Sequence, residues 1–255
     1  MEKKENIIHL ENVFKSFGDR KVLDGVSLEV VAGETLVIIG RSGVGKSTIL
    51  KHIAGLLAPD SGQVWVEGQD VADLKEEALN ELRKKMGVVF QYAALFDSLT
   101  VFENVAFRLL RDFKMSRVKA VEVVRAKLEL VGLQDDLLDL KPSQLSGGMR
   151  KRVGLARAIA VDPEIILYDE PTSGLDPVSS AAIDELIMDM QKKLHITSVV
   201  VTHDMRSAYQ VANRIAMIYD GKIIGTGTPQ EIENSAHPII HQFVTGSVNG
   251  PIPIR

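Results

Sequence analysis

The sequence predicts an α/β fold in which helices cover both faces of a mostly parallel sheet. Three observations support this prediction. Strand-like and helix-like segments alternate after about residue 160. Two β-rich runs near the N-terminus are too close together for a helix between them, so they form an antiparallel β region. Residues from about 95 to 160 are mostly helical in their periodicity, which adds a helical block.

Strands are predicted where short β-rich or apolar runs lie between turn residues. Only Gly18-Asp19 separates the first two runs, which favours a hairpin. The run TLVII at 35–39 lacks alternation, as is typical of a parallel strand buried on both faces. In chain order, the predicted strands are residues 7–17, 22–30, 35–39, 63–67, 86–90, 165–168, 198–201, 215–219 and 222–225.

Helices are predicted where apolar residues recur every three or four positions. Pro59 limits the first of them, Gly132 lies at a C-cap position and Ser146 at an N-cap position. In chain order, the predicted helices are residues 47–57, 101–111, 117–131, 147–160, 177–193 and 205–212.

Composition restricts the location and the class of function. The chain of 255 residues has no cysteine, which excludes disulfides and thiolate chemistry. Its net charge of −4 argues against a nucleic-acid partner. The longest apolar runs have five residues, whereas a membrane-spanning helix needs about 20. No secretory signal is visible at the N-terminus, so we expect a cytoplasmic protein.

A glycine-rich loop follows the strand at 35–39 and fits the phosphate-binding pattern G-x-x-x-x-G-K-[ST]. Glycines let backbone N–H groups turn inward around a phosphate, and the following helix adds its positive dipole end. Lys46 is expected to reach the outer phosphates and Ser47 to supply a hydroxyl ligand to Mg²⁺. The candidate nucleotide-binding residues are Gly40, Arg41, Ser42, Gly43, Val44, Gly45, Lys46, Ser47 and Thr48.

A pair of acids ends the predicted strand at 165–168. Ligands of α/β sheets bind at the C-terminal ends of strands, which is where Asp169 and Glu170 emerge. We expect Asp169 to hold Mg²⁺ through water and Glu170 to polarise an attacking water as a general base. The alternative is an ordinary strand with a polar end.

Residues 145–149, LSGGM, resemble the signature LSGGQ of ABC transporters, with Met in place of Gln. Together with the glycine-rich loop, the acid pair, Gln91 and His203, all in the family's order and spacing, the chain resembles an ABC ATP-binding cassette over about residues 6–240. The resemblance implies a P-loop NTPase (RecA-like) core with an antiparallel β subdomain and an inserted α-helical subdomain, and an ATPase that uses ATP and Mg²⁺. The implied regions of this single domain are 1–92 with 160–226 for the β subdomain and core, 93–159 for the helical subdomain, and 227–255 for a C-terminal helical segment and tail.

The signature has a physical basis as a second phosphate site. Ser146 is an N-cap residue, and Gly147 and Gly148 expose backbone N–H groups at a helix N-terminus. The resemblance implies a head-to-tail homodimer in which each signature meets the ATP held by the other chain's loop. Taken alone, the three residues are better explained as a simple loop that enters a helix.

Four single residues receive roles from the same resemblance. Phe17 matches the aromatic residue that stacks on adenine; the alternative is core packing in the hairpin. Gln91 matches the residue that contacts Mg²⁺ or the attacking water and links the core to the helical block. Asp176 matches the loop that crosses the dimer interface. His203 matches the histidine that bonds the γ-phosphate and helps to place Glu170.

Other polar residues are not expected to form sites. His237 and His241 lie four residues apart without further metal ligands nearby, so we expect them to be surface residues. The basic run 149–152, MRKR, at the start of the signature helix is expected to face phosphates or the dimer partner rather than a nucleic acid.

The cassette resembles a separate subunit that docks on an integral-membrane permease at the cytoplasmic face of the inner membrane. Apolar residues at 92–107 favour a groove for a permease helix, although some of them are expected to pack inside the helical block. Residues 94–107 and the tail at 243–251 resemble the ATPase of Mla-type phospholipid-transport systems. That resemblance implies a permease of the MlaE type and a lipid-binding MCE-domain protein.

The tail, residues 247–255, is extended and carries the apolar residues Val248, Ile252 and Ile254. We expect it to pack against the second cassette or a small accessory protein; the alternative is a disordered end. Three alternatives stay open: an amino-acid-type solute importer ATPase, a soluble ABC protein of DNA repair or translation, and a non-hydrolysing regulator. The last would require a damaged Glu170 or His203, and both are intact.

Overall fold

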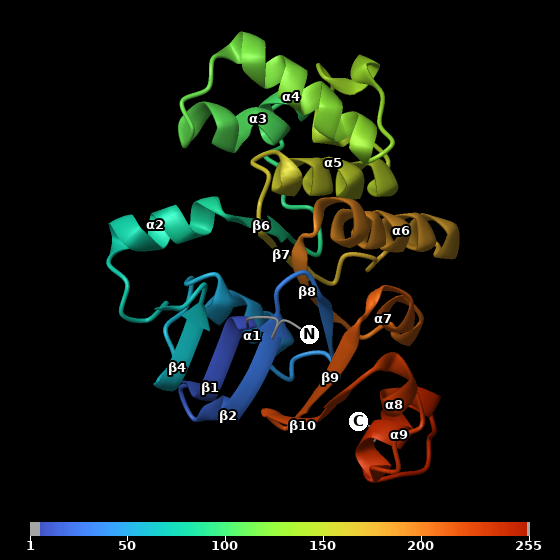
Figure 1. The fold of residues 1–255 in the computed structure, drawn as a ribbon. Helices are drawn as coiled ribbons and strands as arrows, with labels where there is room; N and C mark the ends of the chain where they lie inside the picture. Colours follow the sequence, from blue (N-terminus) through green and yellow to red (C-terminus); the bar gives the residue numbers. More distant parts are fainter. Residues whose placement is uncertain (1–5, 254–255) are drawn as a thin grey trace. The chain divides into compact units, whose positions relative to one another are not determined.

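A computed structural model describes residues 6–253. These residues form two compact units, drawn in Figure 1. We call residues 6–79 with 197–253 the β-rich unit and residues 80–196 the helical unit. The boundary between them falls inside helix α2 (Glu76–Lys84). No helix in the described part of the chain is long and apolar enough to cross a membrane.

An antiparallel sheet occupies one side of the β-rich unit, in the order β2-β1-β4-β5. The predicted hairpin is confirmed, because the first two strands pair antiparallel and Phe17 lies opposite Arg20. The strands are β1 (Asn6–Phe17), β2 (Arg20–Val31), β4 (Ser61–Val66) and β5 (Gln69–Asp70).

A second set of strands in the same unit is mostly parallel, in the order β10-β9-β3-β8. β3 runs parallel to both β8 and β9, and β10 turns back antiparallel to β9. Every residue of β3 and β8 is buried, as expected for strands covered on both faces. The strands are β3 (Thr35–Ile39), β8 (Thr197–Thr202), β9 (Arg214–Tyr219) and β10 (Lys222–Gly227).

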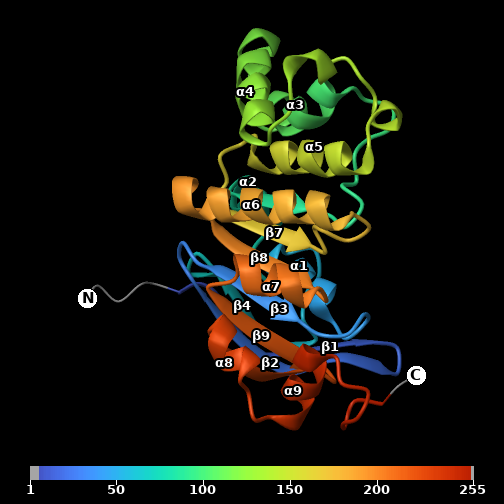
Figure 2. The same ribbon diagram turned by 90° about the vertical axis from the view of Figure 1, so that its right-hand side faces the viewer.

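Four helices complete this unit, and α8 packs on β9, β10 and α9 (Figures 1 and 2). The first helix ends at Ile53, so its predicted extension to residue 57 was wrong. Gly55 adopts the left-handed φ of 63°, and the N–H of Leu56 donates to the Lys51 carbonyl at 2.8 Å, which closes the helix as in a glycine C-cap. The helices are α1 (Lys46–Ile53), α7 (Met205–Val211), α8 (Pro229–Glu233) and α9 (Pro238–Thr245).

The tail after α9 folds back on that helix. The Gln242 side chain accepts from the Ile252 N–H at 2.6 Å and donates to the carbonyls of Ser247 and Ile252 at 3.2 and 3.3 Å. Ile252 is buried, whereas Val248 is exposed. Packing of this tail on another subunit stays a prediction, and Ile254 lies outside the described residues.

The helical unit combines two parallel strands with a helical bundle. β6 (Met86–Val89) pairs with β7 (Ile165–Asp169), and α3 packs on both α4 and α5 (Figure 2). Apolar residues of all three helices form the core of the bundle, including Val105, Val124, Leu128 and Leu155. The helices other than α2 are α3 (Val101–Arg111), α4 (Arg117–Leu130), α5 (Gly147–Ile159) and α6 (Pro177–Leu194), with 3₁₀ turns at Asp135–Leu137 and Pro142–Gln144.

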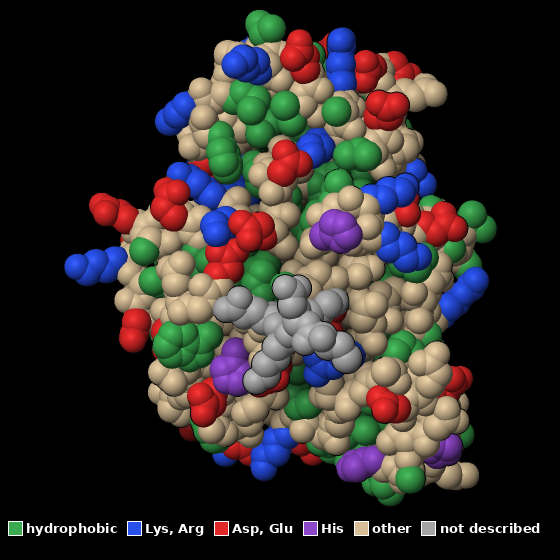
Figure 3. Space-filling view, in the orientation of Figure 1, with side chains coloured by type: hydrophobic (Ala, Val, Ile, Leu, Met, Phe, Trp, Pro, Cys, Tyr) green, Lys and Arg blue, Asp and Glu red, His purple; other side chains and the backbone are tan. Residues whose placement is uncertain are grey.

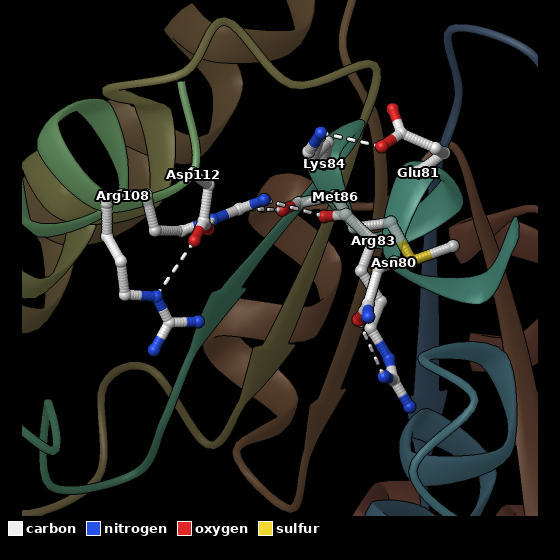
Figure 4. A network of polar contacts seen from close by, with 8 residues as sticks. Asn80, Glu81, Arg83, Lys84, Met86, Arg108 and Asp112 are labelled. Carbon is white, nitrogen blue, oxygen red and sulfur yellow. Dashed lines mark hydrogen bonds and ion pairs between the residues drawn. The ribbon is translucent and has the colours of Figure 1, made fainter. Parts of the chain in front are cut away.

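One arginine ties the bundle to β6 (Figure 4). Arg108 donates to the carbonyls of Met86 and Arg83 at 2.7 and 2.9 Å, and its Nε lies 3.3 Å from Asp112 Oδ2. Burial raises the pKa of Asp112, but hydrogen bonds from Arg111 and Arg108 outweigh it and hold this pKa below its ordinary value. The carboxylate therefore stays ionised and keeps Arg108 in place.

Arg108→Ala is expected to lower the free energy of unfolding by about 2 kcal/mol, because two carbonyls and a carboxylate lose a donor. Arg111→Ala is the control: this exposed side chain contacts the same carboxylate, and its loss is expected to cost less than about 0.5 kcal/mol. Urea denaturation measures both. Since the pKa of Asp112 is lowered by folding, part of the difference is expected to disappear as the pH falls through that pKa. Equal losses for both variants would contradict the account.

Candidate functional site: a glycine-rich loop and an acidic strand end

The glycine-rich loop joins β3 to α1 in the β-rich unit. Gly40 needs to be glycine, because a Cβ there would lie 2.5 Å from the Ile218 carbonyl oxygen. Gly45, at φ 111°, forms the N-cap of α1, so backbone N–H groups of the first turn face the loop. Arg20 on β2 donates to the Gly43 carbonyl at 2.7 Å and fixes the loop from outside. This arginine could not be predicted from the sequence, since no motif includes it.

Lys46 lies inside the loop and is almost fully buried. Its ammonium donates to the carbonyls of Gly40 and Arg41 at 2.8 and 3.2 Å. A phosphate oxygen competes well for such a donor, because it forms a charge-assisted hydrogen bond. The other side of the loop is joined to the tail, where Arg41 Nη1 donates to the Pro253 carbonyl at 3.0 Å.

His203 emerges at the same edge of the sheet as the loop. β3 and β8 run parallel with Ile39 opposite Thr202, so Gly40 and His203 directly follow neighbouring strand ends. Asp204 caps α7 behind this histidine, and its carboxylate accepts from the Arg206 N–H at 2.9 Å.

Phe17 lies at the end of β1 with 53% of its surface exposed, and Lys15 Nζ is 5.9 Å from the ring centroid. This exposure argues against core packing as its role. Stacking on adenine stays a prediction.

In the helical unit, Gln91 and the acid pair lie at the ends of two neighbouring strands. β6 and β7 are parallel with Val89 opposite Tyr168, so Gln91 and the acid pair emerge at one edge. Gln91 Nε2 donates to Ser173 Oγ at 3.2 Å, which joins this glutamine to the segment after Glu170. Glu170 has the left-handed φ of 48°, a strained conformation for a residue with a side chain.

The signature begins α5, as predicted. Ser146 is the N-cap, and its Oγ accepts from the Met149 N–H at 3.2 Å. Ser146 and Gly147 are exposed, so the N-terminus of a 13-residue helix is accessible to an anion from outside the chain. Gly148 lies beside Ser179 at the start of α6.

Asp176 caps α6, a role that was not predicted from the sequence. Its carboxylate accepts from the N–H groups of Val178 and Ser179, both at 3.0 Å, and from Ser179 Oγ at 2.6 Å. The hydrogen bond from the Ser179 side chain is the main cause of its lowered pKa.

The run 149–152 was expected to face phosphates or the dimer partner, and this prediction was wrong for Lys151. Lys151 is buried and donates to carbonyls of its own chain. Arg150 and Arg152 donate to the carbonyls of Leu145 and Val131 at 2.8 and 2.9 Å. All three side chains therefore have partners within the helical unit.

The segment expected to receive a permease helix divides between core and surface. Phe102 and Val105 are buried in the bundle, while Tyr92 is 81% exposed and Phe96 is also exposed. Asn104 holds this loop, accepting from the Phe96 N–H at 2.8 Å and donating to three backbone carbonyls. Figure 3 shows further hydrophobic side chains on the surface over α3 and α4.

The candidate Mg²⁺ donors are the Ser47 hydroxyl, the Gln91 amide and the Asp169 carboxylate. All three offer hard oxygen atoms, which suit Mg²⁺. Within residues 6–253, no group of three or more His, Cys, Asp or Glu side chains could hold a metal ion.

Comparisons with known proteins agree with the motifs. The family model described as "ABC transporter" matches residues 23–173. The chain is 43% identical to the protein TRIGALACTOSYLDIACYLGLYCEROL 3 of Arabidopsis thaliana, covering 96% of this chain and 75% of that protein. It is 40% identical to the intermembrane phospholipid transport system ATP-binding protein MlaF of Haemophilus influenzae, covering 98% and 95%. It is also 40% identical to a probable ribonucleotide transport ATP-binding protein of Mycobacterium leprae, covering 96% and 70%.

Solved structures give the same result for the fold. The dimeric ATP-binding cassette MJ0796, bound to ADP and phosphate after hydrolysis, superposes with a TM-score of 0.81 at 35% identity, covering 87% of this chain and 98% of that one. The predicted P-loop NTPase core with its antiparallel and helical additions is therefore confirmed. On both kinds of comparison, the chain belongs to the ABC transporter family and is an ATP-hydrolysing cassette.

Proposed function

We propose that this chain forms a head-to-tail homodimer that hydrolyses ATP to drive a membrane permease for phospholipids. The observation that carries the substrate class is the 40% identity, over nearly the whole chain, to a phospholipid transport ATP-binding protein. A second relative of similar identity is named for a galactolipid. In this proposal the chain works at the cytoplasmic face of the inner membrane.

The proposed binding roles belong to residues at the strand ends described above. The loop 40–48 holds the phosphates of ATP, with Lys46 on the outer ones, and Phe17 stacks on adenine. Mg²⁺ held through Ser47, Gln91 and Asp169 would neutralise charge on the phosphates. His203 bonds the γ-phosphate.

The proposed hydrolytic roles belong to two residues of the helical unit. Glu170 accepts a proton from the attacking water, since it is the carboxylate that follows the strand end of β7. Gln91 orients the same water, and its bond to Ser173 keeps its side chain near the segment after Glu170. In this proposal, the glycine-rich loop and Phe17 bind ATP, whereas Glu170 and Gln91 are needed for its hydrolysis.

Dimerisation is proposed because the signature lies open at a helix N-terminus. Ser146 and Gly147 are exposed, and Asp176 and Ser179 lie on the neighbouring segment that would face the same partner. The relative MJ0796 is dimeric in its solved structure. Each ATP would then be held between one chain's loop and the other chain's signature. The regions 1–92 with 160–226, 93–159 and 227–255 remain our proposed division of the cassette.

The proposed membrane partners are permease subunits of the MlaE type, with an MCE-domain lipid-binding protein and a small accessory subunit. The exposed Tyr92 beside Gln91 suits an apolar permease helix, because helices of this kind dock through their apolar faces.

Tyr92→Glu is expected to reduce recovery of the permease with the tagged full-length chain at least tenfold, because a carboxylate replaces an aromatic contact. The measurement is co-purification from detergent-solubilised membranes of the native host, with lipids extracted from the complex. Val118→Glu is the matched control, since Val118 is 75% exposed on α4 of the same unit. Equal recovery with both variants would contradict docking at Tyr92.

The same preparation tests the substrate. Wild-type complex is expected to retain phospholipid and to transfer it between vesicles when ATP is added. A ribonucleotide transporter is the second candidate, supported by the mycobacterial relative. ATP-dependent uptake of labelled ribonucleotides without lipid transfer would favour that candidate and contradict the proposal.

A further inference from the structure

Lys151 is a buried cation that the proposed mechanism does not yet use. It lies on α5, five residues after the signature Ser146, with only 6% of its surface exposed. Its ammonium donates to the Gln91 carbonyl and, at 3.4 Å, to the Glu170 carbonyl. Burial of an ammonium is strongly unfavourable unless hydrogen bonds replace its hydration, so these contacts are needed to keep it there.

The segment beginning at Gln91 is also held by a second cation of the same helix. Arg157 donates to the carbonyls of Ala93 and Ala94 at 2.6 and 2.7 Å. Both alanines have left-handed backbones, with φ 60° and 46°. Gly154 packs so closely that its missing Cβ would lie 3.1 Å from Ala93 Cβ. Contacts from one face of α5 to the backbone of residues 91–94 therefore determine the path of this segment.

Glu170 depends on its backbone in a comparable way. Its left-handed φ of 48° stores strain, and such conformations persist only where surrounding contacts determine them. Its carbonyl is held by Lys151, which is also attracted by the carboxylates of Glu170 and Asp169. The direction of the Glu170 side chain follows from this backbone conformation.

We propose that Lys151 is a positioning residue that ties the signature helix to the backbone of Gln91 and of Glu170. Five helical residues span about 7.5 Å, over which a helix moves as a rigid body. A shift of Ser146 against a partner's ATP is thus passed to the hydrolytic residues of the same chain. The consequence for hydrolysis rests on the proposed roles of Glu170 and Gln91; the backbone contacts do not.

The test compares Lys151→Met with Lys151→Arg in the full-length protein. Lys151→Met is expected to lower kcat by about 10- to 100-fold, because misplacing a catalytic group by about 1 Å has an effect of this size. KM for ATP is expected to change less than threefold, since Lys151 is not in the phosphate loop. Lys151→Arg is expected to restore most of kcat, because a guanidinium donates to two carbonyls.

Hydrogen exchange supplies a readout independent of turnover. Without nucleotide, the amides of residues 90–94 and 170–173 are expected to exchange at least fivefold faster in Lys151→Met. Lys127→Met is the control, because Lys127 is similarly buried on α4 but pairs with Asp162. It is expected to lower the Tm without affecting either segment or kcat. If Lys151→Met does not fold, Lys151→Gln replaces it, because its amide keeps a donor without the charge.

Two outcomes would overturn the proposal: a kcat within twofold of wild type, or unchanged exchange in both segments of a folded variant. Failure of the underlying site assignment is distinguishable. Normal hydrolysis by Glu170→Gln would refute the role of Glu170, whereas the exchange measurement would still test the tether.

Discussion

Glu170→Gln is expected to bind ATP with near wild-type affinity and to hydrolyse it about 10² to 10⁴ times more slowly. Glutamine preserves the size of the side chain but cannot accept the proton of the attacking water, and a positioned base commonly contributes this factor. The variant also removes one negative charge near the γ-phosphate, so ATP-bound dimers are expected to accumulate. Steady-state kcat and equilibrium binding of a fluorescent ATP analogue measure the two effects separately.

Glu164→Gln is the matched control for this substitution. Glu164 immediately precedes the same strand β7, at the opposite end from Glu170, and is an exposed residue 3.4 Å from Lys85. Its loss is expected to leave kcat unchanged. Comparable kcat values for wild type and Glu170→Gln would refute the assignment of the general base.

Ser146→Arg is expected to abolish hydrolysis while the isolated chain still folds and binds ATP. The substitution removes the cap of α5, which costs about 1 kcal/mol, and places a large cation at the positive end of the helix. The bulk of arginine blocks approach of a second chain to the signature. Measurements of kcat, Tm and ATP binding distinguish this result from misfolding.

Ser143→Arg provides the control for charge and size. Ser143 is exposed in the 3₁₀ turn Pro142–Gln144, three residues before the signature serine. Hydrolysis by this variant is expected to remain near the wild-type rate. If Ser146→Arg also hydrolysed ATP normally, the signature would have no role in turnover.

Much of the fold could be predicted because its elements have strong local signals. The buried strand Thr35–Ile39 and the helix Val101–Arg111 have the predicted bounds. Helix α2 was missed because five of its nine residues are charged, and only Leu79 and Leu82 give it an apolar face. The prediction that α1 continues to residue 57 followed its apolar spacing. That spacing gives no sign of the left-handed turn at Gly55, which ends the helix.

The candidate site shows a similar contrast. Motif residues such as Lys46 and Ser146 could be found because glycines and caps occur at fixed spacings around them. The buried position of Lys151 could not be predicted, because a run of three basic residues is typical of a solvent-facing surface. Successive helical residues point about 100° apart, and tertiary contacts decide which of the three is buried. Arg20 was missed for a related reason, since it reaches Gly43 from a separate strand.

A mixed dimer tests most directly whether each ATP is shared between two chains. Lys46→Ala disables a phosphate loop and Ser146→Arg a signature, both in chains that also carry Glu170→Gln to prevent turnover. The measurement is the number of ATP molecules retained per dimer after rapid gel filtration. With the two mutations on opposite chains, one composite site keeps both elements and one ATP is expected per dimer. With both on the same chain, one site lacks its loop and the other its signature, so neither site closes and no ATP is expected to be retained through gel filtration. The reverse result, with ATP retained only when both mutations share a chain, would contradict the head-to-tail account.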